Sequence, residues 1–250
     1  NRMMTSEVSP RPGRFSYEYT PYLREPANFF SQENPARIMA IMKGAQVGFS
    51  TGVIETALGY VISQDPGNIL FLTGHADLAD EAVKVKIDNL IANSGIGHLI
   101  RSNSVHKRNS RTGDTNKMKE FPGGMAIFGA GNHKLLRQRS MKIGFFDDMD
   151  AAKSSEKASG STRKMFEQRF AAYSTTKKIA YISTPELEET SNIELVYLLG
   201  DQRRYHIPCP CCDELIIIDW EVPMEHNSTK LAGMTWQTNE NGRLIKGTAG

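Results

Sequence analysis

Short apolar segments alternate with segments of helical periodicity along most of the chain, and this alternation constrains the fold more than any other feature. The expected strands lie at 37–42, 68–73, 125–128, 141–146 and 178–183. The expected helices lie at 50–63, 76–92, 133–138 and 162–173, and one more begins at Thr20-Pro21, an N-cap followed by proline. Apolar strands separated by helices are typical of a parallel sheet covered on both faces. The sequence therefore predicts an α/β fold with three layers around a mostly parallel central sheet.

Length, apolar runs and cysteine usage limit the class of protein. The chain has 250 residues, enough for one large domain or a core with a small appendage. No apolar run approaches the ~20 residues that cross a bilayer, and the N-terminus lacks the apolar core of a signal peptide. All three cysteines lie between 209 and 212 and do not make a disulfide framework. We therefore expect no membrane association and a reducing intracellular compartment.

The distribution of charge says more than its sum. The formal net charge of +2 does not by itself indicate a protein that binds nucleic acid. Residues 94–120 are polar and expected to be irregular. Within them, the run from Arg101 to Lys119 carries basic residues against one acid, Asp114. This run either contacts phosphates or forms a solvated loop, and the sequence leaves both interpretations open.

Residues 41 to 51 read I-M-K-G-A-Q-V-G-F-S-T and join an expected strand to an expected helix. This is the context of a phosphate-binding (Walker A) loop, whose backbone N–H groups bind phosphate oxygens at a helix N-terminus. The usual pattern, G-x-x-x-x-G-K-[ST], has lysine just before the hydroxyl residue, but here Phe49 occupies that position and Lys43 opens the loop. A lysine at the first position can reach the phosphates from the other rim. The candidate nucleotide-binding residues are Lys43, Gly44, Ala45, Gln46, Val47, Gly48, Phe49, Ser50 and Thr51. For this stretch taken alone, a structural turn is the alternative.

Two further elements follow in the order that a nucleotide site requires. The segment M-K-I-G-F-F-D-D is an apolar strand that ends on Asp147 and Asp148, as a Walker B element does. The first acid would hold Mg²⁺, and the second would polarise the attacking water. Glutamate is commoner at the second position, so the shorter Asp148 needs a closer water or help from Asp150. The segment I-S-T-P-E places Ser183 and Thr184 at the end of a later strand, where motor ATPases sense the γ-phosphate. An acidic turn and a Ser-Thr-Pro turn without a ligand remain the alternatives.

The chain resembles the large terminase subunit of lambda-type tailed phages, in its N-terminal ATPase half. The resemblance rests on M-K-G-A-Q-V-G-F-S (42–50), L-L-R-Q-R-S-M-K-I-G-F-F-D-D (135–148), I-S-T-P (182–185) and G-D-Q-R-R-Y-H-I-P-C-P-C-C (200–212). In that family the lysine does stand at the start of the loop. The resemblance implies a RecA-like (ASCE) P-loop NTPase core at 36–200. It also implies an N-terminal arm and adenine-side helix at 1–35, and a β-rich extension at 201–250 resembling part of a zinc-ribbon-like insertion.

Roles carry over from the family residue by residue. Lys43 matches the phosphate-binding lysine and Ser50 the hydroxyl beside Mg²⁺, while Asp147 matches the metal-binding acid. Asp148 stands where the family usually has glutamate, and this departure puts the rate of ATP turnover by this chain in doubt. Gln46 stands where some members carry an arginine, and Arg137 and Arg139 are candidates for that missing cation, in cis or from a neighbouring subunit. Near the expected base site, Tyr19, Pro21 and Tyr22 either stack on the adenine or pack in the core.

The cysteine cluster is less informative. Cys209 and Cys212 form C-x-x-C behind His206, but Zn²⁺ usually takes four ligands from two such pairs. Only Cys211 and His226 lie nearby as further donors of the right kind. We therefore expect free thiols in preference to bound Zn²⁺ in this chain.

The resemblance implies a motor that hydrolyses ATP with Mg²⁺ and moves double-stranded DNA into the procapsid. The expected partners are double-stranded DNA, the portal protein and the small terminase subunit. We expect a homo-oligomeric ring on the portal, with the isolated chain either monomeric or assembled, in the cytoplasm of the infected bacterial host. No acidic cluster of a nuclease is found after residue 200, so no DNA cleavage is expected. The alternatives are a helicase-like ATPase and a degenerate ATP-binding module of DNA metabolism.

Overall fold

The structure is a computed structural model that describes residues 2–6, 9–74, 87–101, 114–115, 118–130, 139–152, 162–185, 191–209 and 212–217. The chain divides into two compact units, Asn1–Asp201 and Gln202–Gly250. In the described part of the chain, no helix is long and apolar enough to span a membrane.

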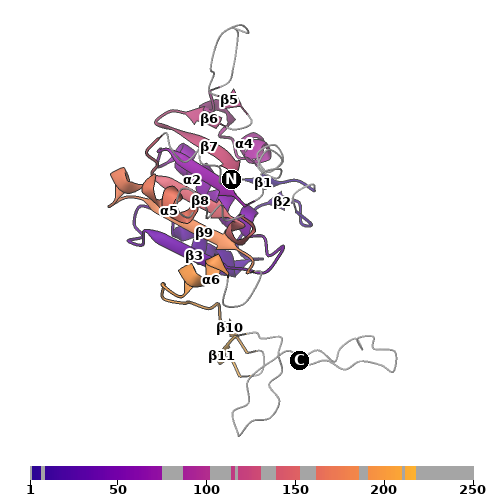
Figure 1. Cartoon of the computed structure of the whole chain (residues 1–250). Coiled ribbons are helices and arrows are strands. Elements are labelled where there is room, and N and C mark those ends of the chain that lie inside the picture. The colour runs from indigo at the N-terminus through magenta and orange to yellow at the C-terminus, as the bar shows by residue number, and fades with distance from the viewer. Residues whose placement is uncertain are drawn as a thin grey trace. The chain divides into compact units, whose positions relative to one another are not determined.

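A seven-stranded sheet forms the centre of the first unit (Figure 1). In spatial order its strands are β3 (Ile38–Met42), β9 (Lys178–Ser183), β8 (Ile143–Asp147), β4 (Ile69–Thr73), β7 (Gly124–Ala130), β6 (Met118–Phe121) and β5 (Asp114–Thr115). The first five run parallel, and β6 and β5 continue the sheet antiparallel. The predicted α/β fold with a mostly parallel sheet is confirmed, with all five predicted strands in it.

The prediction of irregular structure over 94–120 is wrong at β5 and, over more residues, at β6. This strand reads M-K-E-F, and every second residue is buried. One of those buried residues is Lys119, whose Nζ lies 2.9 Å from Oδ1 of Asp88. A polar sequence concealed the strand because a lysine takes a position that usually holds an apolar side chain.

The helices predicted from Thr20, at 50–63 and at 162–173 are present, but those at Gly97–Leu99, Met149–Ala151 and Asn192–Tyr197 were not predicted. The described helices are η1 (Pro21–Leu23), α1 (Arg24–Asn28), the π-helical η2 (Ser50–Glu55), α2 (Thr56–Ser63), α4 (Asp88–Asn93), η4 (Gly97–Leu99), η6 (Met149–Ala151), α5 (Thr162–Gln168), η7 (Ala171–Tyr173) and α6 (Asn192–Tyr197). Pro21 opens η1 as expected, but the Thr20 side chain makes no capping hydrogen bond. The predicted helix at 133–138 and the part of 76–92 before residue 87 lie outside the described residues.

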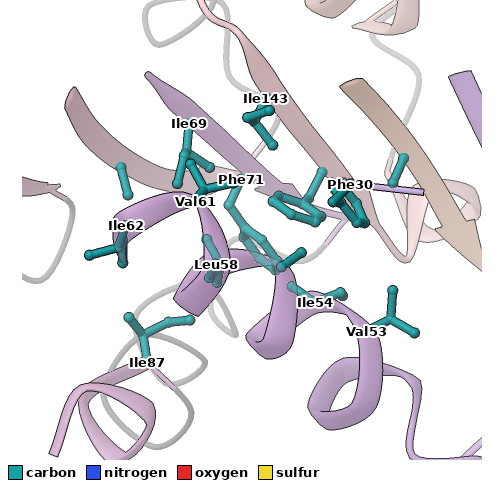
Figure 2. Close-up of a cluster of buried hydrophobic side chains, with 14 of the residues drawn as sticks. Phe30, Val53, Ile54, Leu58, Val61, Ile62, Ile69, Phe71, Ile87 and Ile143 are labelled. Atoms are coloured by element: carbon teal, nitrogen blue, oxygen red, sulfur yellow. The ribbon is translucent and has the colours of Figure 1, made fainter. Parts of the chain in front are cut away.

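Two hydrophobic clusters cover the two faces of the sheet, and so produce three layers. Side chains alternate along each buried strand. On β4, Ile69 and Phe71 therefore face η2 and α2, while Leu70 and Leu72 face α5 and α6. Figure 2 shows the first cluster, in which α2 lies against the sheet through Leu58 and Val61.

The ends of the described chain carry short β-structure. At the N-terminus, β1 (Met3–Met4) pairs antiparallel with β2 (Gly13–Arg14). In the second unit, β10 (Ile207–Pro208) pairs antiparallel with β11 (Leu215–Ile216).

Candidate active site

Three candidate functional segments of the sequence follow neighbouring parallel strands. The register pairs Met42 of β3 with Ser183 of β9, and Asp147 of β8 with Ile182 of β9. The loop after β3, the acids after β8 and Ser183 itself therefore lie at the same edge of the sheet. This is the carboxyl edge, where open α/β sheets bind ligands.

The loop at 43–49 turns tightly between β3 and η2. Gln46 and Gly48 take left-handed backbone conformations, with φ of 57° and 74°. Gly44 does not, so the left-handed backbone of the loop comes from Gly48 and a glutamine. Gly44, Ala45, Gln46 and Gly48 are exposed. These residues are accordingly accessible to a ligand.

Phe49 explains the unusual position of the lysine. Its side chain is 5% exposed and belongs to the core cluster between η2 and the sheet. A lysine here would bury its ammonium among apolar groups, at a cost of several kcal/mol in free energy. The positive charge of this loop is instead carried by Lys43, at the opposite end of the turn.

Lys43 reaches across the edge of the sheet to the acidic turn. Its Nζ lies 3.9 Å from Oδ1 of Asp148, and the two side chains are 14% and 41% exposed. Asp148 has φ 50° and ψ 49°, a left-handed conformation that costs a non-glycine residue about 1–2 kcal/mol. The structure thus brings together the lysine and the second acid, two groups that the sequence separates by about a hundred residues.

Ser183 links the loop to the acidic turn. Its carbonyl oxygen accepts a hydrogen bond from the Lys43 N–H at 3.1 Å. Its hydroxyl oxygen accepts one from the Asp150 N–H at 3.3 Å, and the same hydroxyl donates to the Thr184 carbonyl at 3.2 Å. Ser183 is buried, while the Thr184 side chain is exposed. A displacement of the backbone at Lys43 would therefore be transmitted through Ser183 to Asp150, and the reverse.

Asp150 has a structural role that the sequence did not reveal. Its Oδ1 accepts a hydrogen bond from the Ile193 N–H at 3.0 Å, and its Oδ2 accepts one from the Ser191 hydroxyl. Ser191 is the N-cap of α6 and accepts from the Glu194 N–H at 3.3 Å. The carboxylate is thus engaged in capping α6, and the expectation that it assists the water of Asp148 receives no support from this arrangement. The sequence S-N-I-E is a capping-box signal and could have predicted α6.

Asp147 and Ser50 are the oxygen donors proposed for Mg²⁺. Asp147 ends β8 and is 8% exposed, and its backbone oxygen accepts from the Gly74 N–H at 3.0 Å. Ser50 is the first residue of η2. One carboxylate and one hydroxyl suit Mg²⁺, which usually keeps several waters and takes further oxygens from phosphates. In the described residues no three His, Cys, Asp or Glu side chains gather as a metal site.

The segment at 19–22, which precedes β3 in the chain, contacts the loop through Tyr22. Tyr22 donates a hydrogen bond from its hydroxyl to the Val47 carbonyl at 2.9 Å. Tyr19 is 64% exposed, and the Arg11 guanidinium lies 4.6 Å from its ring centroid. Thr51 donates its hydroxyl to Oε1 of Glu55 at 3.3 Å. Tyr22 therefore contacts the loop directly, and the stacking of either tyrosine on a base stays a prediction.

Comparison with known proteins identifies the family. The family model described as the ATPase domain of the phage terminase large subunit gpA matches residues 9–245. This chain belongs to that family. The match covers nearly the whole chain and includes every segment on which the resemblance was based.

The solved large terminase of bacteriophage HK97 shares the fold of this ATPase domain. The large terminase of bacteriophage HK97 aligns with 81% of this chain and 41% of its own, at 10% identity and a TM-score of 0.56. A variant of the large terminase ATPase domain of Thermus phage P74-26 aligns with 66% of this chain and 65% of its own, at 12% identity and a TM-score of 0.46. The chain therefore spans about two fifths of the length of the HK97 protein. No curated protein sequence matches it.

Of the two arginine candidates of this terminase domain, only Arg139 is among the described residues. Arg139 is exposed and precedes β8, so it lies toward the amino end of that strand, away from the loop. Its guanidinium contacts the sulfur atoms of Met118 and Met125. Arg137 lies outside the described residues. A cation supplied by a neighbouring subunit stays a prediction.

Cys209 and Cys212 lie around the β10–β11 hairpin of the second unit. The Cys209 N–H donates to the Glu214 carbonyl at 2.8 Å, and the Asp213 N–H donates to the Cys209 carbonyl at 2.9 Å. Nδ1 of His206 lies 3.0 Å from the Arg204 carbonyl. Cys211 and His226, the other donors considered, lie outside the described residues.

Proposed function

We propose that this terminase ATPase domain hydrolyses ATP to ADP and phosphate, and that it drives double-stranded DNA into a procapsid. The observation that carries the proposal is the approach of Lys43 to Asp148 within 3.9 Å at the carboxyl edge of the sheet. One group has the charge to bind a γ-phosphate, and the other has the carboxylate to orient water. Their proximity supports a site that performs both tasks on one phosphate.

Each residue of the site has a distinct task in this proposal. Lys43 and the exposed backbone of 44–48 bind the phosphates, since backbone N–H groups and an ammonium are their usual partners. Asp147 and Ser50 would hold Mg²⁺, which supplies positive charge to the β- and γ-phosphates. Asp148 orients the attacking water and accepts its proton. Ser183, bonded to Lys43 on one side and Asp150 on the other, relays the loss of the γ-phosphate.

The proposed partners follow from the family. We infer double-stranded DNA as the substrate moved, with the portal protein and the small terminase subunit as partners, in the cytoplasm of the infected host. A ring on the portal would let a neighbouring subunit contribute an arginine. The part of the reaction that needs such an arginine would be slow in the isolated domain.

Binding of a slowly hydrolysed fluorescent ATP analogue with Mg²⁺ tests the nucleotide site. We expect the wild type to bind, and Lys43→Ala to lose at least ~1.5 kcal/mol, the scale of a charge-assisted contact to phosphate. The matched control is Lys164→Ala, an exposed lysine on α5. Equal affinity of wild type and Lys43→Ala would refute the site.

A second variant separates binding from hydrolysis. Asp148→Asn keeps a side chain of the same shape but removes the base, so it should bind the analogue and lose ATP turnover. Turnover should be measured with portal-bearing procapsids and DNA, so that any ring can assemble. Turnover in Asp148→Asn equal to that of the wild type would exclude Asp148 as the base. Binding without turnover in both would favour a degenerate ATP-binding module.

A further inference from the structure

Side chains from the N-terminal segment bind three backbone carbonyls of the loop and its following turn. Tyr22 donates to Val47 at 2.9 Å, Tyr17 donates to Gly52 at 2.8 Å, and Nη2 of Arg2 donates to Thr51 at 2.7 Å. The three donors are spread over twenty residues of the chain, but the three acceptors lie within six. The N-terminal segment therefore holds the phosphate loop from behind at several points.

The contact made by Tyr22 has a direct consequence for the loop amides. A peptide unit is planar and trans, so its C=O and the next N–H point in opposite directions. A hydrogen bond that holds the Val47 carbonyl toward Tyr22 therefore directs the Gly48 N–H away from it. Gly48 is exposed and has φ 74°, which leaves this amide available to an anion.

Arg2 and Tyr17 restrain the turn that follows. The Thr51–Gly52 peptide unit is held at both ends, because its carbonyl accepts from Arg2 and its N–H donates to Gly48 at 2.8 Å. Tyr17 holds the carbonyl of the next unit. With these peptide units fixed, the carbonyl of Gly48 is fixed as well.

This support is buried and closely packed. Nη1 of Arg2 lies 3.2 Å from Oε2 of Glu55, with side chains only 9% and 7% exposed. The Arg2 guanidinium also lies 4.5 Å from the ring centroid of Phe15. Leu23 packs so closely on Gly52 that a Cβ there would lie 2.4 Å from its Cδ1. A charged pair that is this well buried is sensitive to the loss of either partner.

We propose that Tyr22 is a positioning residue that sets the affinity of the loop for phosphate by orienting the Gly48 amide, with Arg2 and Tyr17 fixing the turn behind it. This inference rests on the proposed function, since it assumes that the loop binds phosphate. It assigns Tyr22 a task different from stacking on the adenine base. The two tasks use different parts of the side chain, since stacking needs the ring and positioning needs the hydroxyl.

The variant Tyr22→Phe distinguishes the two, because it keeps the ring and removes only the hydroxyl. The probes are the fluorescent ATP analogue with Mg²⁺ and tripolyphosphate, which has no base, as its competitor. We expect Tyr22→Phe to weaken both ligands by a similar factor, about 2- to 10-fold, as the loss of one hydrogen bond allows. The matched control, Tyr173→Phe, alters η7 at the amino end of the sheet and should change neither.

Several outcomes would overturn the proposal. Unchanged affinity of Tyr22→Phe for both ligands would refute it, whether or not the melting temperature falls. Failure of tripolyphosphate to compete in the wild type would also refute it, because oriented loop amides must bind phosphates without a base. Lys43→Ala, measured in the same assay as Tyr22→Phe, separates the hypothesis of a nucleotide site from the hypothesis of a positioning role for Tyr22. If Lys43→Ala loses binding and Tyr22→Phe does not, the nucleotide site stands and the positioning role falls.

Two substitutions of Arg2, one that removes its charge and one that keeps it, provide a second test of the proposal. Arg2→Met removes the donor to Thr51 and leaves Glu55 buried with one partner fewer, so the affinity for both ligands should fall by at least the factor seen for Tyr22→Phe. Arg2→Lys restores a charge beside Glu55 and should recover part of the affinity. Equal affinity of Arg2→Met and wild type would contradict the role of Arg2.

Discussion

Substitution of Asp150 by alanine should destabilise the first unit by removing the anchor of α6. The carboxylate accepts hydrogen bonds from the Ile193 N–H and the Ser191 hydroxyl. A hydrogen bond to a charged group contributes about 1.5–3 kcal/mol. Asp150 is half-buried, so water can replace it in part, and we expect a total loss of about 2–3 kcal/mol, near the upper range for loss of a cap.

Thermal unfolding followed by calorimetry measures this loss. For a unit of about 200 residues, 1 kcal/mol corresponds to about 2–4 °C in Tm, so Asp150→Ala should melt about 4–12 °C lower. Asp150→Asn keeps an oxygen that can accept from Ile193, and should lose about half as much. Glu33→Ala, an exposed acid in the loop before β3, is the control and should leave Tm unchanged.

A double-mutant cycle with Ser191→Ala tests the contact itself. Groups in direct contact show a coupling free energy of 0.5–3 kcal/mol, whereas independent sites add within about 0.3–0.5 kcal/mol. We expect a coupling of about 1 kcal/mol between Asp150 and Ser191. Additive effects of the two substitutions would show that the carboxylate does not anchor α6.

Three further predictions follow from other contacts. Ser183→Ala removes the acceptor of the Asp150 N–H but keeps the carbonyl bonded to Lys43, so kcat for ATP should fall with little change in KM; a rise in KM alone would contradict a coupling role. Gly74→Ala would place a Cβ 2.1 Å from the Asp148 carbonyl oxygen, a backbone atom, and should lower the free energy of unfolding by about 1–3 kcal/mol. Gly44→Ala meets only Val47, at 3.8 Å, and should lower it far less. Denaturant unfolding of the two variants tests this difference. Burial, helped by the charge of Glu167, raises the pKa of Tyr181 well above 10.0, so its contribution to stability is present below about pH 10 and is lost as the pH rises further. Burial lowers the pKa of Lys178, so this lysine changes the pH dependence of stability in the opposite direction to Tyr181. The test is therefore a comparison of variants: above about pH 10, stability should fall less steeply in Tyr181→Phe than in wild type.

The alternation of apolar strands and helices was sufficient to predict the central sheet, because burial of strands on both faces imposes a pattern that is visible locally. The strands at 68–73 and 178–183 and the helix from Ser50 to Ser63 were predicted within a residue or so of their observed ends. The strand β6 and the short helix α6 were missed. In β6 a buried lysine replaced the apolar signal, whereas α6 had a local signal, the capping box S-N-I-E, that the prediction did not use.

The segments of the candidate site could be predicted from local patterns, because a loop before a helix and acids after a strand are features of neighbouring residues. How these segments meet could not be predicted in this way, because it depends on the order of the strands in the sheet. Lys43 reaches Asp148 because β3, β9 and β8 lie side by side in parallel, and no local pattern encodes that order. The left-handed turn at Gln46, the burial of Phe49 and the hydrogen bond from Tyr22 to Val47 have the same origin. Each depends on packing between segments distant in sequence, and such contacts contribute free energy only once the chain has folded and brought those segments together.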